Sequence, residues 1–190
     1  ISMPDVQQTI SDFYRVATER DFARDFQFRV LSIDAGGASS TTFDEDDLVY
    51  CTAGSLPPRS ITNVAVPYMG LQFNIPGNAT YPGSEAYSLQ FYCDQNSQIR
   101  QKFEDMSRDV FDDATSTGNY FTPRQSASIN LVQLDTQLDE VAGYKLVGAS
   151  VREVGAIEYD ISGGSGAQVT FAATMAYHYF RRTNSQRAVA

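Results

Sequence analysis

"VTFAATMAYHYF", residues 169–180, alternates large apolar side chains with small ones along its whole length. The large set comprises Val169, Phe171, Ala173, Met175, Tyr177 and Tyr179. The small set includes Thr170, Thr174 and His178 and carries no permanent charge. Because successive side chains of a strand point to opposite faces, the stretch predicts one long β-strand with an apolar face toward a core. Solvent-facing strands usually carry Lys and Glu, so we expect the small face to meet another chain or an enclosed space.

His178 is the only histidine in the chain. A catalytic histidine needs a nucleophile and an orienting acid beside it. The sequence has no G-x-S-x-G motif, and neither Cys51 nor Cys93 has a catalytic-type context. We therefore expect His178 to be structural or at the surface, the two cysteines to be buried thiols on strands, and the protein to have no catalytic activity.

The chain has 190 residues, enough for one sizeable core, and we expect a single domain over residues 1–190. Its 12 Phe and 11 Tyr, with only 19% charged residues, are typical of a β-rich protein. The net charge of −9 argues against binding a nucleic-acid backbone, which needs a basic face. No apolar run is long enough to span a bilayer and no signal-peptide pattern opens the sequence, so we expect a soluble protein that folds in the cytoplasm.

The first half of the sequence predicts a helix, several strands and a hairpin. An apolar stripe at three- and four-residue steps predicts an N-terminal helix over about residues 4–20, followed by a strand around 26–33. Residues 34–47 hold five acids and no base, which favours a long acidic loop. "LVYCTA" then predicts a strand that ends at Gly54. The segments that follow predict a short hairpin turning at Tyr68-Met69-Gly70, each arm closed by a proline, and a half-buried strand at "EAYSLQFYC".

The second half predicts the clearest helix and the remaining strands. The helix spans residues 98–111, with Asp94 or Ser97 as its N-terminal cap. Its apolar face, which must pack on a sheet or a neighbour, comprises Ile99, Phe103, Met106 and Val110. Strands are expected at "SINLVQLD", "YKLVGASVREV" and twice after that, with a flexible C-terminal tail over 181–190. The sum is a mainly β fold, an antiparallel β-barrel or sandwich with a flanking α-helix and an N-terminal helix.

Two short motifs resemble ligand-binding sequences but lack the spacing or the flanking residues that such sites require. Asp44, Glu45, Asp46 and Asp47 are four consecutive acids, whereas calcium loops space their oxygen ligands at alternate positions. One histidine and two distant cysteines are too few for a zinc site. Gly163-Gly164-Ser165-Gly166 lacks the helix and lysine of a phosphate loop and is better explained as a hairpin turn. We therefore expect no metal and no cofactor.

The order of these features resembles the tail tube proteins of contractile-tailed, T-even-like bacteriophages. The matching stretches are "RDFARDFQFRVLSI", "CTAGSLP", "ITNVAVPYMGLQFNIPGNATY", "QIRQKFEDM" and "VGASVREVGAIEYDISGGSGAQVTFAATMAYHYF". They cover about residues 20–180 in the family's order. The sequence departs from the family in its long acidic loop, its N-terminal helix and its C-terminal tail, and Phe180 stands where the family has a tryptophan.

The resemblance implies a small β-barrel or sandwich and a structural role in the virion. Six copies would form a ring around a central channel, and stacked rings would form the inner tube of the tail, assembled in the cytoplasm of the bacterial host. The implied partners are other copies of the chain, the tail sheath protein, the tape-measure protein, and the baseplate and tail-terminator proteins. Double-stranded DNA would pass through the channel without specific binding, and no membrane would be involved.

Within this framework we expect Thr170, Thr174 and His178 to face the channel or a neighbouring subunit. The loop that holds Asp44 to Asp47 is expected to reach the next ring. The tube of a pyocin-like or type VI secretion machine is the alternative among assembly proteins. A small β-barrel ligand-binding protein or a hydrolase is the alternative from another class.

Overall fold

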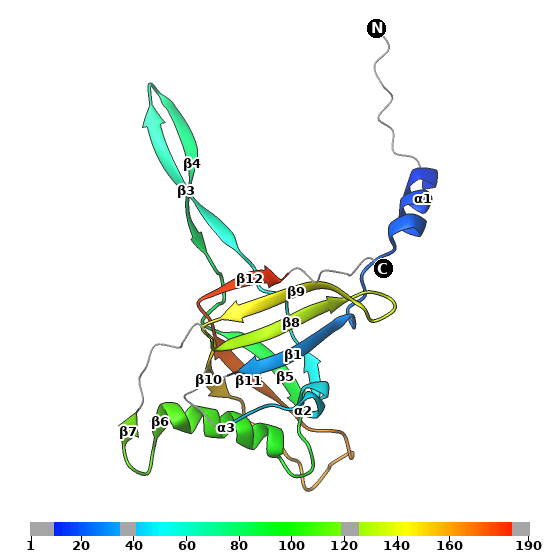
Figure 1. Cartoon of the computed structure of the whole chain (residues 1–190), viewed down its shortest axis with the longest axis vertical. Helices are drawn as coiled ribbons and strands as arrows, with labels where there is room; N and C mark the ends of the chain where they lie inside the picture. Colours follow the sequence, from blue (N-terminus) through cyan, green and yellow to red (C-terminus); the bar gives the residue numbers. More distant parts are fainter. Residues whose placement is uncertain (1–9, 35–40, 119–125, 184–190) are drawn as a thin grey trace.

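The computed structural model describes residues 10–34, 41–118 and 126–183, and every structural statement below refers to these ranges. Its helices are α1 (Ile10–Arg20), α2 (Glu45–Val49) and α3 (Gln98–Val110). The strands of its first half are β1 (Phe28–Asp34), β2 (Cys51–Ala53), β3 (Ser60–Tyr68), β4 (Leu71–Thr80) and β5 (Tyr87–Tyr92). Those of its second half are β6 (Phe111–Asp112), β7 (Thr117–Gly118), β8 (Ser128–Leu134), β9 (Glu140–Val147), β10 (Ser150–Val154), β11 (Thr170–Ala176) and β12 (Tyr179–Thr183). Figure 1 shows a body of strands from which α1 and the β3–β4 hairpin project.

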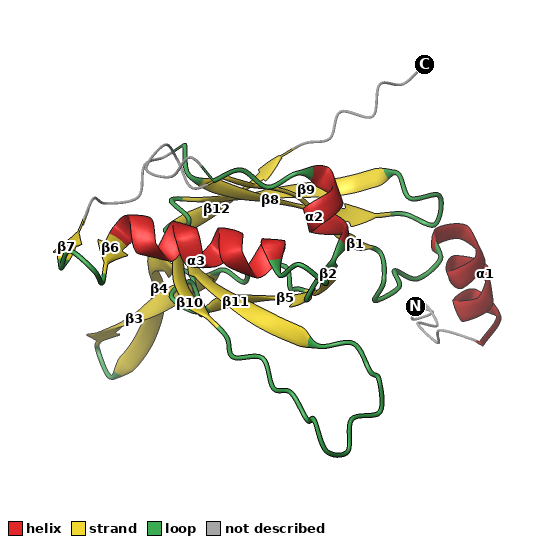
Figure 2. Ribbon diagram, turned by 90° about the horizontal axis from the view of Figure 1, so that it is seen from below, coloured by secondary structure: helices red, strands yellow, loops and turns green. Residues whose placement is uncertain are grey.

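Two four-stranded antiparallel sheets form the body. Sheet A has the order β1-β8-β9-β12, and sheet B has the order β10-β11-β5-β2. Figure 2 shows the two sheets as separate layers, with α3 lying across the open side between them. The predicted antiparallel, mainly β fold is therefore confirmed, as a sandwich that a helix closes on one side.

The core lies between the two layers and is built by alternation along the strands. In β5, Tyr87, Leu89 and Phe91 are buried while the residues between them are exposed. Phe91 pairs with Phe171 of β11, and their rings stack with centroids 5.8 Å apart. Sheet A contributes buried side chains such as Leu131 to the same cluster. The predicted strand at "EAYSLQFYC" is thus confirmed.

Helix α3 is anchored in this core by one aromatic side chain. Phe103 is fully buried, and its ring centroid lies 5.3 Å from that of Phe91 and 6.1 Å from that of Phe171. Asp94 caps the helix, because its carboxylate accepts backbone N–H groups from Gln98 at 3.1 Å and Ile99 at 3.4 Å. The helix thus shares the core of sheet B.

The apolar face expected for this helix is shorter than its sequence suggests. Ile99 and Met106 are buried with Phe103, but Val110 is 41% exposed. Val110 is the last residue of α3, and the chain turns into β6 at Phe111. The helix has left the core at this point, so the packing role expected for Val110 is wrong.

The long strand predicted over residues 169–180 is wrong, because the chain changes sheets inside it. β11 belongs to sheet B and ends at Ala176, whereas β12 belongs to sheet A and begins at Tyr179. "YKLVGASVREV" is divided in the same way at Gly148, between β9 of sheet A and β10 of sheet B. Side chains go on alternating between buried and exposed where a strand turns a corner from one sheet of a sandwich to the other. The sequence pattern therefore does not show that the chain has changed sheets.

The acidic loop expected over residues 34–47 is corrected at both ends, and its residues 35–40 lie outside the described residues. Asp34 ends β1, and residues 45–49 form helix α2, so "LVYCTA" contributes only Cys51–Ala53 to a strand. The backbone N–H of Asp44 donates to the Asp47 carboxylate at 3.0 Å, as in a capping box. Consecutive acids suit the first turn of a helix, where they meet the positive end of the helix dipole.

The predicted ends of the chain differ from the structure in extent. The N-terminal helix is present as Ile10–Arg20, while the part expected before residue 10 lies outside the described residues. The predicted flexible tail begins too early, because residues 181–183 belong to β12 and pair with β9. Backbone pairing does not depend on the polarity of these side chains, which is the signal that suggested a tail. Residues 184–190 lie outside the described residues.

Candidate assembly surface

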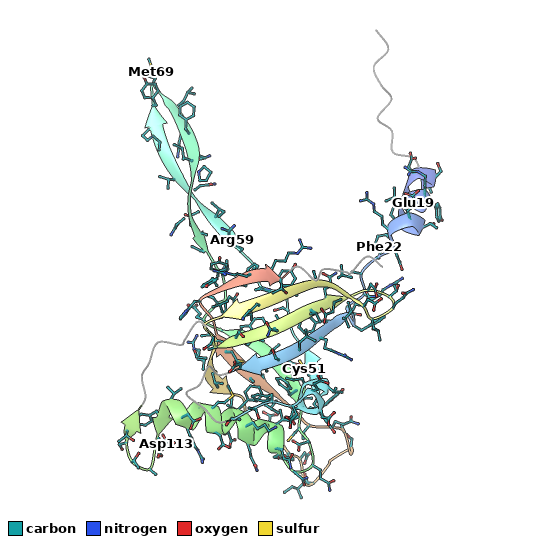
Figure 3. The ribbon with its side chains drawn as sticks, in the orientation of Figure 1. Glu19, Phe22, Cys51, Arg59, Met69 and Asp113 are labelled. Carbon is teal, nitrogen blue, oxygen red and sulfur yellow. The ribbon has the colours of Figure 1, made fainter. Side chains whose placement is uncertain are left out.

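The β3–β4 hairpin extends a few residues beyond the two arms that the sequence predicted, mainly at the end of β4. Its turn at Met69 and Gly70 lies where it was expected, and both residues have positive φ angles. The strands, however, continue through Pro67 and Pro76, which were expected to close the two arms. Each strand of a two-stranded ribbon has an outer edge, and a proline fits wherever its missing N–H would point away from the partner strand. Figure 3 shows the resulting arm, from Arg59 at its base to Met69 at its tip.

One face of this hairpin is entirely apolar and exposed. The pairs Val64–Ile75, Val66–Phe73 and Tyr68–Leu71 lie directly opposite one another in the ladder, so all six side chains share one face. Phe73 is 49% exposed and Leu71 is 65% exposed. An exposed apolar surface of this kind marks a site of interaction. We refer to these six residues as the hairpin apolar face.

The other face of the hairpin mixes polar side chains with alanine and prolines and carries no charge. It carries Asn63, Gln72 and Asn74, and no Asp, Glu, Lys, Arg or His occurs between Arg59 and Glu85. Exposed strands are normally protected from pairing with other chains by charges. We therefore expect another surface to cover this exposed, charge-free ribbon.

The base of the hairpin is held by tyrosines. The Tyr87 hydroxyl donates to the backbone oxygen of Ser55 at 2.6 Å, before β3 begins. Tyr81, just after β4, packs edge-on against Phe180 with ring centroids 5.5 Å apart. Burial raises the pKa of Tyr87 well above its usual value, and burial also raises that of Tyr177 beside it. These contacts fix the direction in which the arm leaves the body.

The outward face of sheet B carries small, uncharged side chains at its centre. Thr170 and Thr174 of β11 lie on this face, and Thr174 pairs with Ser88 of β5. Gln90 lies on the same face of β5, opposite Ala172. The uncharged character expected for Thr170 and Thr174 extends to β5, but on the other side of β11 the exposed Glu153 of β10 pairs with Thr174.

His178 does not share this face. It is exposed, and its backbone N–H donates to the oxygen of Val147 at 2.9 Å, in the connection that leads from sheet B to sheet A. The structure therefore brings Thr170 and Thr174 together and separates His178 from them. The physical reason is the sheet change after Ala176, which ends the period-2 pattern of side-chain directions.

Two of the four consecutive acids, Asp44 and Asp47, lie near a lysine of α3, and the other two face solvent. The Asp47 carboxylate accepts a hydrogen bond from the Lys102 ammonium of α3, and the Asp44 carboxylate lies 3.9 Å from the same ammonium. Glu45 and Asp46 are exposed. Asp44 and Asp47 are thus attached to α3, and a contact of this segment with a neighbouring ring stays a prediction.

The remaining features give little support to catalysis or ligand binding. Within the described ranges, no group of His, Cys, Asp and Glu side chains is arranged to hold a metal ion. A hollow of about 690 Å³ lies under the connection 155–169, lined largely by glycines and polar groups such as Glu158 and Asp160. Backbone and side-chain hydrogen bonds from Gly163 and Ser162 lower the pKa of Asp160. Ligand pockets are mostly apolar, so this hollow does not favour the small-molecule alternative.

No helix in the described part of the chain combines the length and apolar character that a membrane span requires. Both cysteines are free thiols and are only half-buried. Cys51 opens β2, and Cys93 directly follows β5. The expectation of buried strand thiols is therefore met only in part.

The hairpin apolar face is visible in the sequence as an alternating apolar pattern, although no known motif marks it. Alternate residues from Val64 to Tyr68 and from Leu71 to Ile75 are apolar, and the whole segment lacks charge. Alternation of this kind is ordinarily attributed to packing against a core. Only the tertiary structure shows that no core lies beneath these two strands.

No family model matches the sequence, and no curated protein matches it. Several solved structures share this fold. A chain of the anti-feeding prophage baseplate aligns with 87% of this chain and 97% of its own length, at 14% identity and a TM-score of 0.57. A chain of an extracellular contractile injection system, from the PVC sheath–tube complex in the extended state, aligns over 93% and 99% at 9% identity and a TM-score of 0.57. A chain of the anti-feeding prophage cap, which terminates the tube, aligns over 87% and 93% at 9% identity and a TM-score of 0.57.

These alignments cover most of both chains, so the tail-tube type of fold predicted from the sequence is confirmed. Identities this low establish a shared fold alone.

Proposed function

We propose that this protein is a structural subunit of the inner tube of a contractile phage tail. Six copies would close each ring, rings would stack into a tube, and DNA and the tape-measure protein would occupy the channel. The observation that carries the proposal is the hairpin apolar face, which is exposed, charge-free and held out from the body. An exposed apolar surface of this kind marks a site of interaction, which the proposal assigns to other copies of the chain.

The negative charge of the chain is compatible with a channel through which DNA passes. A net charge of −9 repels DNA weakly, whereas a basic lining would bind phosphates and slow the passage of the duplex. The outward face of sheet B around Thr170 and Thr174, which carries the acidic Glu153 and no base opposite these threonines, is our candidate for the channel wall or a subunit contact. Glu45 and Asp46 remain candidates for a contact between rings, through helix α2.

The proposal assigns no reaction to the protein. Its partners would be the sheath outside the tube, the tape-measure protein inside it, and the baseplate and terminator proteins at its ends. Assembly would take place in the cytoplasm of the host bacterium, and the finished tube would be part of the virion.

The test is electron microscopy and analytical ultracentrifugation of the purified full chain. Six-fold rings or hollow tubes are expected. Phe73→Asp places a charge on the hairpin apolar face and is expected to leave a folded monomer, with an unchanged circular dichroism spectrum. Asn74→Asp places the same charge on the opposite face of the hairpin and is expected to assemble more nearly like the parent chain. A parent chain that stays monomeric at every concentration would overturn the proposal.

A second candidate is the tube of an injection machine that delivers protein. It is favoured by the fold shared with chains of the anti-feeding prophage and of an extracellular contractile injection system. The two functions differ in their cargo. Particles that contain this chain, purified after nuclease treatment, should hold protected DNA if the chain belongs to a phage tail. They should hold none if it belongs to an injection machine.

A further inference from the structure

Helix α1 carries a second exposed apolar surface. Ile10, Phe13 and Tyr14 are 78%, 61% and 68% exposed, and no residue of the helix is buried. These three side chains lie on one face together with Ala17, at three- and four-residue steps. An isolated helix of 11 residues is marginal in water, so this stripe requires a cover to be stable.

Three charged side chains of α1, Asp12, Arg15 and Glu19, lie on the face opposite its apolar stripe and pair with one another. The Arg15 guanidinium lies 3.9 Å from the Asp12 carboxylate and 3.6 Å from the Glu19 carboxylate. These pairs are solvent-exposed and remain so when the apolar stripe is covered. A partner for the stripe therefore needs no charges of its own, and burying the contact would leave no ion unpaired.

The hairpin apolar face meets this requirement. It offers six apolar side chains on a segment that lacks charge from residue 60 to residue 84. The described chain thus carries two exposed apolar surfaces that match in polarity. Among the described residues, the hairpin face has no cover and the α1 stripe has only Phe22, whose ring centroid lies 6.2 Å from that of Phe13. Each surface supplies the apolar contact that the other requires.

The two surfaces are placed so that they meet between copies. Figure 1 shows the hairpin and α1 projecting from the same side of the body but at its two opposite ends, and Figure 2 shows the same separation from below. Figure 3 marks this with Met69 at one extremity and Glu19 at the other. When copies stand side by side in one orientation, the hairpin of each lies next to α1 of the following copy. A contact between two different surfaces, repeated by rotation, closes into a ring.

We propose that the hairpin apolar face packs on the apolar stripe of helix α1 from the neighbouring copy of this chain. This inference rests on the self-assembly proposed above and names the two surfaces that meet. Phe13 and Tyr14 of one copy cover Val66 and Phe73 of the next. The contact is lateral, within a ring, because both elements point the same way from the body.

Cysteine cross-linking between two variants tests the contact. In a Cys51→Ala, Cys93→Ala background, one variant carries Phe13→Cys and the other carries Phe73→Cys. The two are mixed as monomers, assembled and oxidised, and then separated on a non-reducing gel. A disulfide-linked dimer is expected in the mixture at more than tenfold its level in either variant alone, with the 13–73 linkage identified by mass spectrometry.

Matched controls place the cysteine on the opposite face of each element. Arg15→Cys replaces Phe13→Cys in one mixture, and Asn74→Cys replaces Phe73→Cys in another; both are expected to give only background cross-linking. Equal cross-linking in the controls would overturn the inference. So would dimers formed by the Phe13→Cys variant alone, which would pair α1 with α1.

A further pair of measurements separates this inference from the proposed function. Rings that assemble from both variants without a 13–73 disulfide overturn the contact and leave self-assembly intact. A parent chain that never assembles overturns both. Sedimentation of the parent chain with phosphatidylcholine vesicles, lost in Phe73→Asp, would show that lipid covers the hairpin and would also overturn the contact.

Discussion

The imidazole of His178 lies against Gly148, where a Cβ atom on the glycine would overlap the ring. The two residues belong to two of the chain's crossings between the sheets, one leaving sheet A and the other returning to it. Gly148 has a φ of +74° and donates its N–H to the oxygen of Ala127 at 2.8 Å. The only histidine of the chain therefore covers a corner of the sandwich, and no described nucleophile or acid is arranged with it as in a catalytic triad.

Replacing Gly148 should destabilise the fold. Gly148→Ala adds a Cβ to a residue with a left-handed backbone and pushes it into the His178 ring, so a loss of about 1–3 kcal/mol in the free energy of unfolding is expected. Urea unfolding, followed by circular dichroism, measures this loss.

Two controls separate the contribution of the backbone conformation from that of the overlap with His178. Gly166→Ala has a similar φ of +77° but open space around it, so it should show only the backbone part of the loss. Adding His178→Ala to Gly148→Ala should recover the part that comes from the overlap. If Gly148→Ala is no more costly than Gly166→Ala, the contact with His178 has no energetic role.

Removing the aromatic ring that joins α3 to sheet B should be among the most costly core changes. Phe103→Ala leaves a cavity between Phe91, Phe171 and Phe43, and a loss of about 3–5 kcal/mol is expected. Val110→Ala, on the same helix but exposed, should change the free energy of unfolding by less than about 0.5 kcal/mol. Similar losses for both variants would contradict the position of α3 described here.

The Cys51 thiol should react slowly in the folded protein. Burial raises the pKa of Cys51 from 9.0 to about 11, so the thiolate fraction near pH 8 falls roughly a hundredfold. Alkylation by iodoacetamide, followed by mass spectrometry, should be correspondingly faster after unfolding in urea. Equal rates in the two states would refute the prediction.

The same shift predicts a loss of stability at high pH. The unfolded thiol ionises near pH 9 while the folded one stays protonated, so stability present below pH 9 is lost as the pH rises toward 11. Urea unfolding at a series of pH values measures this loss. In the Cys51→Ser variant the part of the loss that comes from this thiol should disappear.

The ion pair between Lys102 and Asp47 should hold α2 against α3. Lys102→Met keeps the aliphatic stem and removes the charge, which should loosen residues 41–49 by roughly 1 kcal/mol, or about fivefold in amide hydrogen exchange. Hydrogen exchange of peptides from this segment measures the effect. Arg15→Met removes the exposed pairs of α1 and should leave exchange at 41–49 unchanged.

Local patterns in the sequence predicted much of the fold. The alternation in β5, the turn at Met69 and Gly70, the Asp94 cap and the buried positions Ile99, Phe103 and Met106 all follow from spacing over a few residues. Such features depend on neighbouring residues and on the periods of helix and strand. The errors occur where a period continues across a corner, as at Gly148 and at His178, or where acidity was taken to mean a loop, as at Asp44 to Asp47.

By itself, the sequence determined which side chains are apolar and at what period they recur, and therefore which elements form and which of their faces avoid water. Only the tertiary structure decided which of those faces find a cover within the chain. Phe171 and Phe73 both lie on alternating apolar strands, yet Phe171 is buried under α3 while Phe73 projects into solvent. The physical reason is that burial depends on what packs against a face from elsewhere in the chain, which no local pattern records. The faces left uncovered, on the hairpin and on α1, are those through which we propose that copies of this chain meet.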